Sequence, residues 1–298
     1  MEITRYLSTK KALVDRALDG YLQTCPDLPP LLLEAMRYSV FAGGKRLRPI
    51  LALAAGEAVG GGSEPILPAA CAIELIHTCA LIHDDLPALD DDEYRRGKLT
   101  NHKVFGEDIA IVAGDGLLTF AFELLSTAYG NGLVSPTVAL CLVREIATAA
   151  GTRGMVAGQV VDLQSEGEEP NAETLRYIHR HKTGDMITVS VRVGAIVAGA
   201  NEAQLAALTE YARNLGLAFQ ISDDVLDVIG DREKLGKTVG KDANQKKMTY
   251  VALYGLDAAR KMVHGRVERA KAALAGLNGD GRAGSLLSLA DFVVSRDH

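Results

Sequence analysis

Apolar residues along this chain recur at the three- and four-residue steps of α-helices, whereas the alternating pattern of strands is rare. One segment, bracketed by Pro68 and Pro87, is apolar on nearly every side of a helix of about 18 residues, ~27 Å long. A helix without a polar face has no side to turn toward water. This pattern therefore predicts a helix buried inside a bundle.

A second long helix is predicted to begin at Asn201, a favourable N-cap with Gln204 three residues on, as in a capping box. Apolar residues then repeat at helical steps, and Gly230 is a natural stop after roughly 28 residues, about 42 Å. No Pro/Ser-rich linker divides the chain, so we expect an all-α fold with residues 1–298 as one domain. Glycine-rich and polar stretches predict loops at 56–65, 165–173 and 230–247.

Composition and charge narrow the class of protein. The net charge is -6 and no basic stripe is present, which argues against binding nucleic acid. The most membrane-like stretch carries Glu74, His77 and His83, so we expect no membrane span, and the N-terminus lacks the apolar core of a signal peptide. The four cysteines show no zinc-site or CxxC spacing. We therefore predict a soluble cytoplasmic protein.

Carboxylates gather near the end of the second long helix, in "FQISDDVLD". Gln220, Asp223, Asp224 and Asp227 follow the spacing of one helix face, and no lysine or arginine lies within a turn on that face. Taken alone, such a run is typical of a solvated surface. Inside a bundle it would need positive charge, and hard divalent cations such as Mg²⁺ prefer oxygen ligands.

The first apolar helix runs into a second acidic stretch, "CALIHDDLPALDDDEYRRGK". Pro87 disfavours helix in the residue before it, so the chain should leave the helix just after Asp84 and Asp85. Asp90 can then fold back toward them, and His77 lies two turns earlier on the face of Asp84. A single histidine here is as typical of a core as of a site. Because both acidic runs follow apolar helices and begin with paired aspartates, together they favour two metal sites.

Basic residues are clustered as well, and arginine forks and lysine point charges both bind phosphate. The clusters are Lys45, Arg46 and Arg48; Arg95 and Arg96; Lys182; and Lys237, Lys241, Lys246 and Lys247. "GDREKLGKT" has five residues between its glycines rather than the four of a P-loop, and no nucleophile–base arrangement stands out. The pattern indicates a ligand with several phosphates and chemistry that begins with departure of diphosphate.

The ordered motifs "GGKRLRP", "IHDDLPALDDDEYRRGK", "GQVVDL", "HKTG", "FQISDDVLD" and "LGKTVGKD" resemble those of trans-type short-chain isoprenyl diphosphate synthases, the farnesyl and geranylgeranyl diphosphate synthases. The resemblance spans nearly the whole chain. It implies a bundle of long helices around a deep central cavity, usually as a homodimer. It also implies a prenyltransferase that condenses isopentenyl diphosphate with an allylic diphosphate (dimethylallyl, geranyl or farnesyl), the latter held by three Mg²⁺ ions.

The resemblance also implies roles for individual residues. Asp84, Asp85 and Asp90 would serve the first metal motif, and Asp223 would lead the second, with Asp224 and Asp227 assisting mainly through waters. Isopentenyl diphosphate would be held by Lys45, Arg48, His77 and Arg96, and the allylic diphosphate by Arg95, Lys182 and Lys237. The carbonyl near Lys182, with Thr183 and Gln220, would face the allylic cation.

In this family the length of the prenyl product depends on the residues that precede the first aspartate motif on its helix. Farnesyl synthases of the bacterial type usually carry an aromatic residue five positions before it, where this chain has Cys79, followed by Ala80. Small residues there favour geranylgeranyl diphosphate, with farnesyl diphosphate as the alternative. Leu99 and Asp185 depart from the family pattern, the second by adding negative charge near the metal site.

Three other classes of protein fit the sequence less well. A class I terpene cyclase would not need the isopentenyl diphosphate site formed by Lys45, Arg48 and Arg96. A non-catalytic partner subunit of a heteromeric synthase would be expected to have lost an aspartate motif, and both are intact. A simple acidic metal-binding protein would have no reason to carry the arginine and lysine clusters. The sequence favours the synthase.

Overall fold

The computed structural model describes residues 3–23, 28–169, 171–229, 249–277 and 281–295. Its α-helices are α1 (Ile3–Gln23), α2 (Pro30–Val40), α3 (Leu47–Val59), α4 (Leu67–Asp84), α5 (Asn101–Phe105), α6 (Glu107–Ala128), α7 (Pro136–Ala150), α8 (Met155–Gln164), α9 (Ala172–Ile178), α10 (Asp185–Val197), α11 (Glu202–Ile229), α14 (Tyr250–Tyr254), α15 (Leu256–Ala273) and α16 (Gly284–Ser295). Short helical turns are η1 (Glu64–Ile66), η2 (Tyr129–Leu133), η3 (His179–Gly184) and η4 (Ala275–Leu277). In the described ranges, the sheet is limited to the hairpin of β1 (Tyr94–Arg95) and β2 (Lys98–Leu99), so the all-α prediction is confirmed.

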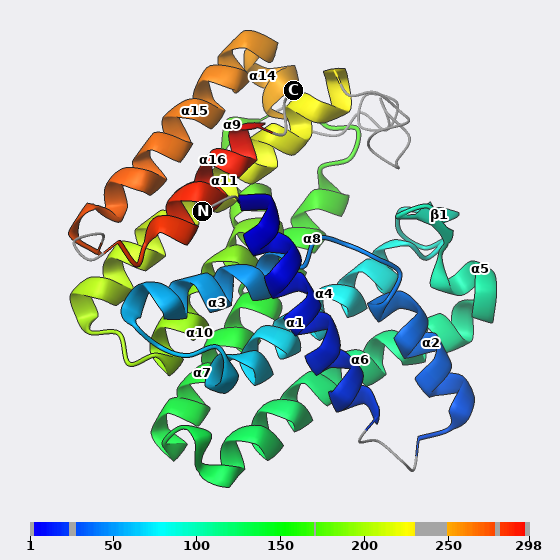
Figure 1. Ribbon diagram of the computed structural model, residues 1–298. Helices are drawn as coiled ribbons and strands as arrows, with labels where there is room; N and C mark the ends of the chain where they lie inside the picture. Colours follow the sequence, from blue (N-terminus) through cyan, green and yellow to red (C-terminus); the bar gives the residue numbers. More distant parts are fainter. Residues whose placement is uncertain (1–2, 24–27, 170, 230–248, 278–280, 296–298) are drawn as a thin grey trace.

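Helix α4 is the central element that the apolar pattern predicted. It spans Leu67–Asp84, with Pro68 in its first turn, and buries residues on all sides. Figure 1 shows it running through the middle of the molecule, and it packs against α1, α3, α6 and α10. Because α4 ends at Asp84, the first acidic motif leaves the protein core at a defined point.

Helix α11 begins with the predicted capping box. The amide N–H of Gln204 donates to Oδ1 of Asn201, and the amide N–H of Asn201 donates to Oε1 of Gln204, both at 2.9 Å. The helix then continues to Ile229, and Tyr211 is fully buried against α16 through a hydrogen bond to the carbonyl of Leu286. Asp223, Asp224 and Asp227 of the second acidic motif therefore lie in the last two turns of this helix.

The predicted loop at 56–65 begins later than expected, because Gly56–Val59 form the last turn of α3. Gly56 serves close packing rather than a turn, since a Cβ there would lie 2.1 Å from Cδ1 of Ile66. The loop starts at Gly60, whose φ of 94° is readily adopted by glycine. The loop predicted at 165–173 ends at Asn171, which caps α9 by accepting from the amides of Glu173 and Thr174.

Two helices of the described chain, within Glu64–Asp84 and Glu107–Leu133, are long and apolar enough to cross a membrane by length and composition alone. Core helices of soluble proteins pass the same test, and 72% of the first window is buried inside the protein. Only 44% of the second is buried, since Ile111, Val112 and Leu118 of α6 are exposed. The expectation of no membrane span stays a prediction, and α6 has apolar side chains that the described residues leave exposed.

Gly194 sets how closely α3 and α10 approach. A Cβ at this position would lie 1.8 Å from the carbonyl oxygen of Ala52, which is backbone and cannot move aside as a side chain would. We expect Gly194→Ala to lower the free energy of unfolding by about 1–3 kcal/mol through overpacking, measured by urea denaturation. The matched control is Gly265→Ala in α15, where a Cβ meets nothing within 4 Å. That substitution should raise stability by about 0.5–1 kcal/mol, and equal effects at both positions would contradict this account.

Candidate active site

The first acidic motif folds back on itself directly after α4. The amide N–H of Asp90 donates to the carbonyl of Asp84 at 2.9 Å, and that of Asp92 donates to the carbonyl of Asp85 at 3.2 Å. The turn includes Asp91 at a positive φ of 46°. The prediction that Asp90 returns toward the paired aspartates is confirmed.

Arg95 neutralises the second aspartate of this motif. Its Nε donates to both carboxylate oxygens of Asp85, at 2.7 and 2.9 Å, and its Nη2 lies 2.5 Å from Oδ1. The β1–β2 hairpin presents Arg95 in this way because Arg96 and Gly97 both adopt positive φ at its turn. Asp85 is only 3% exposed, so without this fork a buried charge would be left uncompensated.

Asp84 is held in a different electrostatic state. Burial raises its pKa to about 6, and the neighbouring charges of Asp90 and Asp85 act in the same direction, against Lys182 and Arg95. These surroundings therefore disfavour the ionised form of the Asp84 carboxylate. A divalent cation at this position would restore it, and the available donors are the hard carboxylate oxygens that Mg²⁺ prefers.

The aspartates of the second acidic motif point in two different directions from α11. Asp223 and Asp227 lie one turn apart on α11 and are partly exposed. Asp224 is 5% exposed, and its Oδ2 accepts the backbone N–H of Tyr250 at 2.8 Å. Because successive helical residues are rotated by about 100°, Asp224 turns into the core and ties α11 to α14. The prediction of one shared carboxylate face holds only for Asp223 and Asp227.

Lys182 lies on η3, a π-helical turn of a kind often found at functional sites. Its Nζ donates to Oδ2 of Asp162 on α8 at 2.6 Å. Gly158 permits this approach, since a Cβ there would lie 2.2 Å from the backbone nitrogen of Lys182. Sequence reasoning missed Asp162 as a site residue. The signal was available, because "GQVVDL" places this aspartate one helical turn after Gly158.

Asp185, which departs from the family pattern, has a partner on the same turn. Its Oδ2 lies 2.8 Å from Nδ1 of His181. Burial raises the pKa of Asp185, and the hydrogen bond from His181 opposes that shift. The extra negative charge is therefore partly offset by a local donor. Thr183 lies on η3 beside it, and η3 packs against α11, which carries Gln220.

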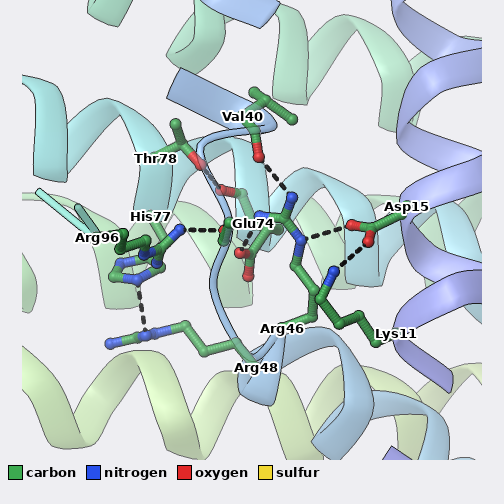
Figure 2. A network of polar contacts seen from close by, with 10 residues as sticks. Lys11, Asp15, Val40, Arg46, Arg48, Glu74, His77, Thr78 and Arg96 are labelled. Carbon is green, nitrogen blue, oxygen red and sulfur yellow. Dashed lines mark hydrogen bonds and ion pairs between the residues drawn. The ribbon is translucent and has the colours of Figure 1, made fainter. Parts of the chain in front are cut away.

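The basic residues at the start of α3 lie beside α4, and Figure 2 shows Arg46 and Arg48 next to Glu74 and His77. Nη1 of Arg48 donates to Nε2 of His77 at 3.0 Å, and Nη1 of Arg96 donates to the carbonyl of Gly43 at 2.5 Å. Burial, then the charges of Arg48 and Arg96, hold the pKa of His77 well below its usual range, so its ring stays neutral. Lys45 is exposed, with its Nζ 5.6 Å from the centre of the Phe292 ring.

The Nε of Arg48 is buried without a hydrogen-bond partner among the described residues. A guanidinium whose buried Nε has no partner, next to a second arginine and a neutral histidine, is suited to an anionic ligand. The charge of Asp223 acts on Arg48, and that of Lys182 acts on Asp84. These influences link the basic cluster, η3 and both acidic motifs electrostatically.

Some predicted residues are not placed in this arrangement. Lys237, Lys241, Lys246 and Lys247 lie outside the described residues. Arg46 belongs to the basic run by sequence, but it is 2% exposed and points into the core. Within the described chain, no three His, Cys, Asp or Glu side chains are gathered closely enough to define a metal site. The metal ligands therefore remain predictions.

Cys79 and Ala80 lie one turn below the first motif. Cys79 is 6% exposed, with its Sγ 3.9 Å from Nδ1 of His83. Nε2 of His83 donates to the carbonyl of Ile111 at 3.1 Å, and Gly114 leaves room for the ring. Cys79 therefore faces the α4–α6 contact, whereas Ala80 is partly exposed.

Comparisons with known proteins identify the family and the fold. Residues 29–274 match the polyprenyl synthetase family. The chain is 47% identical to farnesyl diphosphate synthase of Geobacillus stearothermophilus, over 100% of this chain and 99% of that protein. It is 46% identical to geranylgeranyl diphosphate synthase of Cyanophora paradoxa, over 98% and 96%. A crystal structure of an FPP/GFPP synthase from Zymomonas mobilis superposes with a TM-score of 0.86 at 35% identity, covering 98% of both chains.

The raised pKa of Asp84 predicts a pH-dependent gain in stability for Asp84→Asn. The folded-state pKa, about 6, lies above the ordinary value of 3.8, so wild-type stability falls as pH rises through this window. In protein treated with EDTA, Asp84→Asn should raise the free energy of unfolding by about 1–2 kcal/mol above pH 6, allowing for partial exposure. The difference should vanish near pH 4. Urea denaturation across this range checks it, and a gain independent of pH would contradict the assignment.

Proposed function

This chain belongs to the polyprenyl synthetase family, and from that premise we propose that it condenses isopentenyl diphosphate with allylic diphosphates, with geranylgeranyl diphosphate as the favoured product. It is a trans-prenyltransferase, as its farnesyl and geranylgeranyl diphosphate synthase relatives indicate. The observation that supports the proposed site best is the buried Nε of Arg48, which has no hydrogen-bond partner among the described residues. The charge of Asp223 acts on this arginine, and the charge of Lys182 on η3 acts on Asp84 at the end of α4.

The family is generally Mg²⁺-dependent, and the carboxylates present fit that ion. We assign Asp84, Asp85 and Asp90 to one side of the metal site and Asp223 and Asp227 to the other, for three ions in all. Bound Mg²⁺ would supply neutralisation of the negative charge that develops on the departing diphosphate. Asp224, which holds the N–H of Tyr250, would support this set from behind.

Two groups of basic residues would each bind the diphosphate of one substrate. Lys45, Arg48, His77 and Arg96 are assigned to isopentenyl diphosphate, and Arg95, Lys182 and Lys237 to the allylic diphosphate. Arg95 and Lys182 are already oriented by Asp85 and Asp162, so the site would exchange existing ion pairs when the substrate binds. His77 would offer an uncharged ring, since its pKa lies well below the usual range.

The allylic cation would be stabilised without a nucleophilic side chain. The carbonyl near Lys182, the hydroxyl of Thr183 and the amide of Gln220 would present partial negative charge to it. The double bond of isopentenyl diphosphate then forms the new carbon–carbon bond. The departed diphosphate would take the proton that is lost. Because the diphosphate would act as the base, this mechanism needs no side-chain base.

Product length would be set at the α4–α6 contact, where Cys79 leaves less bulk than an aromatic side chain. Farnesyl diphosphate remains the alternative product, since relatives of both kinds are equally similar. A non-catalytic role in a heteromeric synthase is the more distant alternative. A cytoplasmic location stays a prediction.

Purified protein, given Mg²⁺, isopentenyl diphosphate and each allylic starter in turn, should yield geranylgeraniol after dephosphorylation, including from farnesyl diphosphate. Cys79→Tyr should shift the main product to farnesol, because the ring would fill space below Asp84. Chromatographic sizing of the alcohols measures both. Farnesol from the wild type would move the chain-length limit to another residue. An unchanged product from Cys79→Tyr would do the same, and no elongation would contradict the proposed function.

We also propose a homodimer in which the apolar surface of α6 is covered by the second subunit. Ile111 and Val112 are 45% and 48% exposed, and Leu118 lies two turns further along the helix. Leu140 on α7 is also exposed, at 72%. Surfaces of this kind on a single chain are typical of association sites.

Light scattering after size-exclusion chromatography should give twice the chain mass for the wild type. Val112→Glu/Leu118→Glu should give the mass of one chain, because two charges would be buried at the interface. Tyr254→Glu on α14, where an exposed tyrosine lies in a different part of the fold, is the control and should remain dimeric. A dimer that persists in the double variant would place the interface elsewhere.

A further inference from the structure

The loop between α2 and α3 adopts a backbone conformation that residues other than glycine rarely take. Gly43 and Gly44 have φ values of 105° and 109°, and Arg46 follows at 52°. A left-handed conformation in a branched or long residue costs about 1–2 kcal/mol and persists only where surrounding contacts enforce it. Glycine adopts positive φ readily, whereas Arg46 needs contacts that hold its backbone in this conformation.

The guanidinium of Arg46 contacts three helices, as Figure 2 shows. Nε donates to Oδ1 of Asp15 on α1 at 2.8 Å, and Nη1 donates to Oε1 of Glu74 on α4 at 2.9 Å. Nη2 donates to the carbonyl of Val40, the last residue of α2, at 2.5 Å. The three groups accept from three different nitrogens, so a planar fork is required and a lysine could not replace it.

The network is buried at its centre. Arg46 and Glu74 are each 2% exposed, and Asp15 is also paired with Lys11 at 2.5 Å. Breaking one member of a buried ion pair leaves an uncompensated charge, so the pair fixes its geometry strongly. This strong constraint supplies the enforcement that the left-handed backbone at Arg46 needs.

The same constraint reaches the basic cluster from two sides. Arg46 lies between Lys45 and Arg48 in sequence, and its inward side chain leaves Lys45 exposed on the outer side. Gly44 lies against Arg96, since a Cβ there would be 2.4 Å from Nη1. On α4, Glu74 lies one turn before His77, which accepts from Arg48. The loop and the histidine are thus positioned through one buried pair.

We infer that Arg46 is a positioning residue that sets the geometry of the isopentenyl diphosphate pocket without touching the substrate. The inference rests on the proposed function of Lys45, Arg48, His77 and Arg96. It separates two roles within a single basic run. The outer cations bind diphosphate, while the inward arginine holds the strained loop that presents them. The allylic side, which uses Arg95 and Lys182, has its own orienting carboxylates and does not depend on Arg46.

Steady-state kinetics with each substrate varied separately tests the inference. Arg46→Lys should raise the KM for isopentenyl diphosphate by roughly tenfold or more, because small displacements of binding groups have large effects. The KM for the allylic diphosphate should change by less than about twofold. A merely structural role would lower the amount of active enzyme, and hence kcat, with both KM values unchanged. That result would overturn the inference.

Arg192→Lys is the matched control. Arg192 forms a comparable fork, with Nε and Nη2 donating to Glu145 at 2.7 and 2.8 Å and Nη1 to Thr209 at 2.8 Å, between α10, α7 and α11. Its loss should lower the melting temperature but leave both KM values unchanged. A selective rise in the KM for isopentenyl diphosphate in this control would show that any weakened fork has that effect, and would also overturn the inference.

Glu74→Gln provides a second variant that keeps an oxygen acceptor for Arg46 and is milder for folding. It should raise the same KM, by a smaller factor than Arg46→Lys. If Arg46→Lys fails to fold, the kinetics of Glu74→Gln test the inference instead. A selective rise in the KM for isopentenyl diphosphate would support it, and unchanged KM values would overturn it. Wild-type enzyme that lacks isopentenyl-dependent elongation would instead refute the proposed function, so the two failures are distinguishable.

Discussion

The arrangement of the site depends on one electrostatic constraint: partly or fully buried carboxylates near helix ends must be matched by positive charge from another segment. Asp85 is matched by Arg95 and Asp162 by Lys182, both with short contacts at partly buried positions. In each pair the cation comes from a segment with unusual backbone, the positive-φ hairpin or the π-helical η3. Both cations are therefore already oriented at the positions proposed for binding diphosphate.

The same constraint explains why the site is also a source of instability. Asp84 has a raised pKa because burial and neighbouring carboxylates oppose its ionised form. Arg46, Asp91 and Arg96 occupy positive-φ conformations without being glycines. Strain and disfavoured charge of this kind gather at functional sites because the surrounding core can support them. Here the supporting core element is α4, which is buried on all sides and carries Asp84 at its end.

Exposed apolar surface is distributed unevenly between the two long apolar helices. Helix α4 uses nearly all of its apolar surface inside the chain, whereas α6 leaves Ile111, Val112 and Leu118 in contact with solvent. His83 links the two helices by donating to the carbonyl of Ile111, directly beside Cys79. The position proposed to limit product length therefore lies between α4 and α6, and the surface proposed for association lies on the exposed side of α6.

The sequence by itself determined the features that depend on local spacing. Periodicity and prolines located α4, the capping box at Asn201 and Gln204 located α11, and Pro87 predicted the return of Asp90. Motif order was enough to indicate the family. These features succeed because their physical causes act between residues a few positions apart.

Only the tertiary structure decided which polar side chains face the site and which hold it. Asp224 turns to the N–H of Tyr250, Lys182 pairs with Asp162, and Arg46 reaches Asp15 and Glu74. In each case the partners are 20 or more residues apart, so no local pattern records their contact. Their direction is set by helix packing, since burying a charged group is tolerated only where a distant partner meets it.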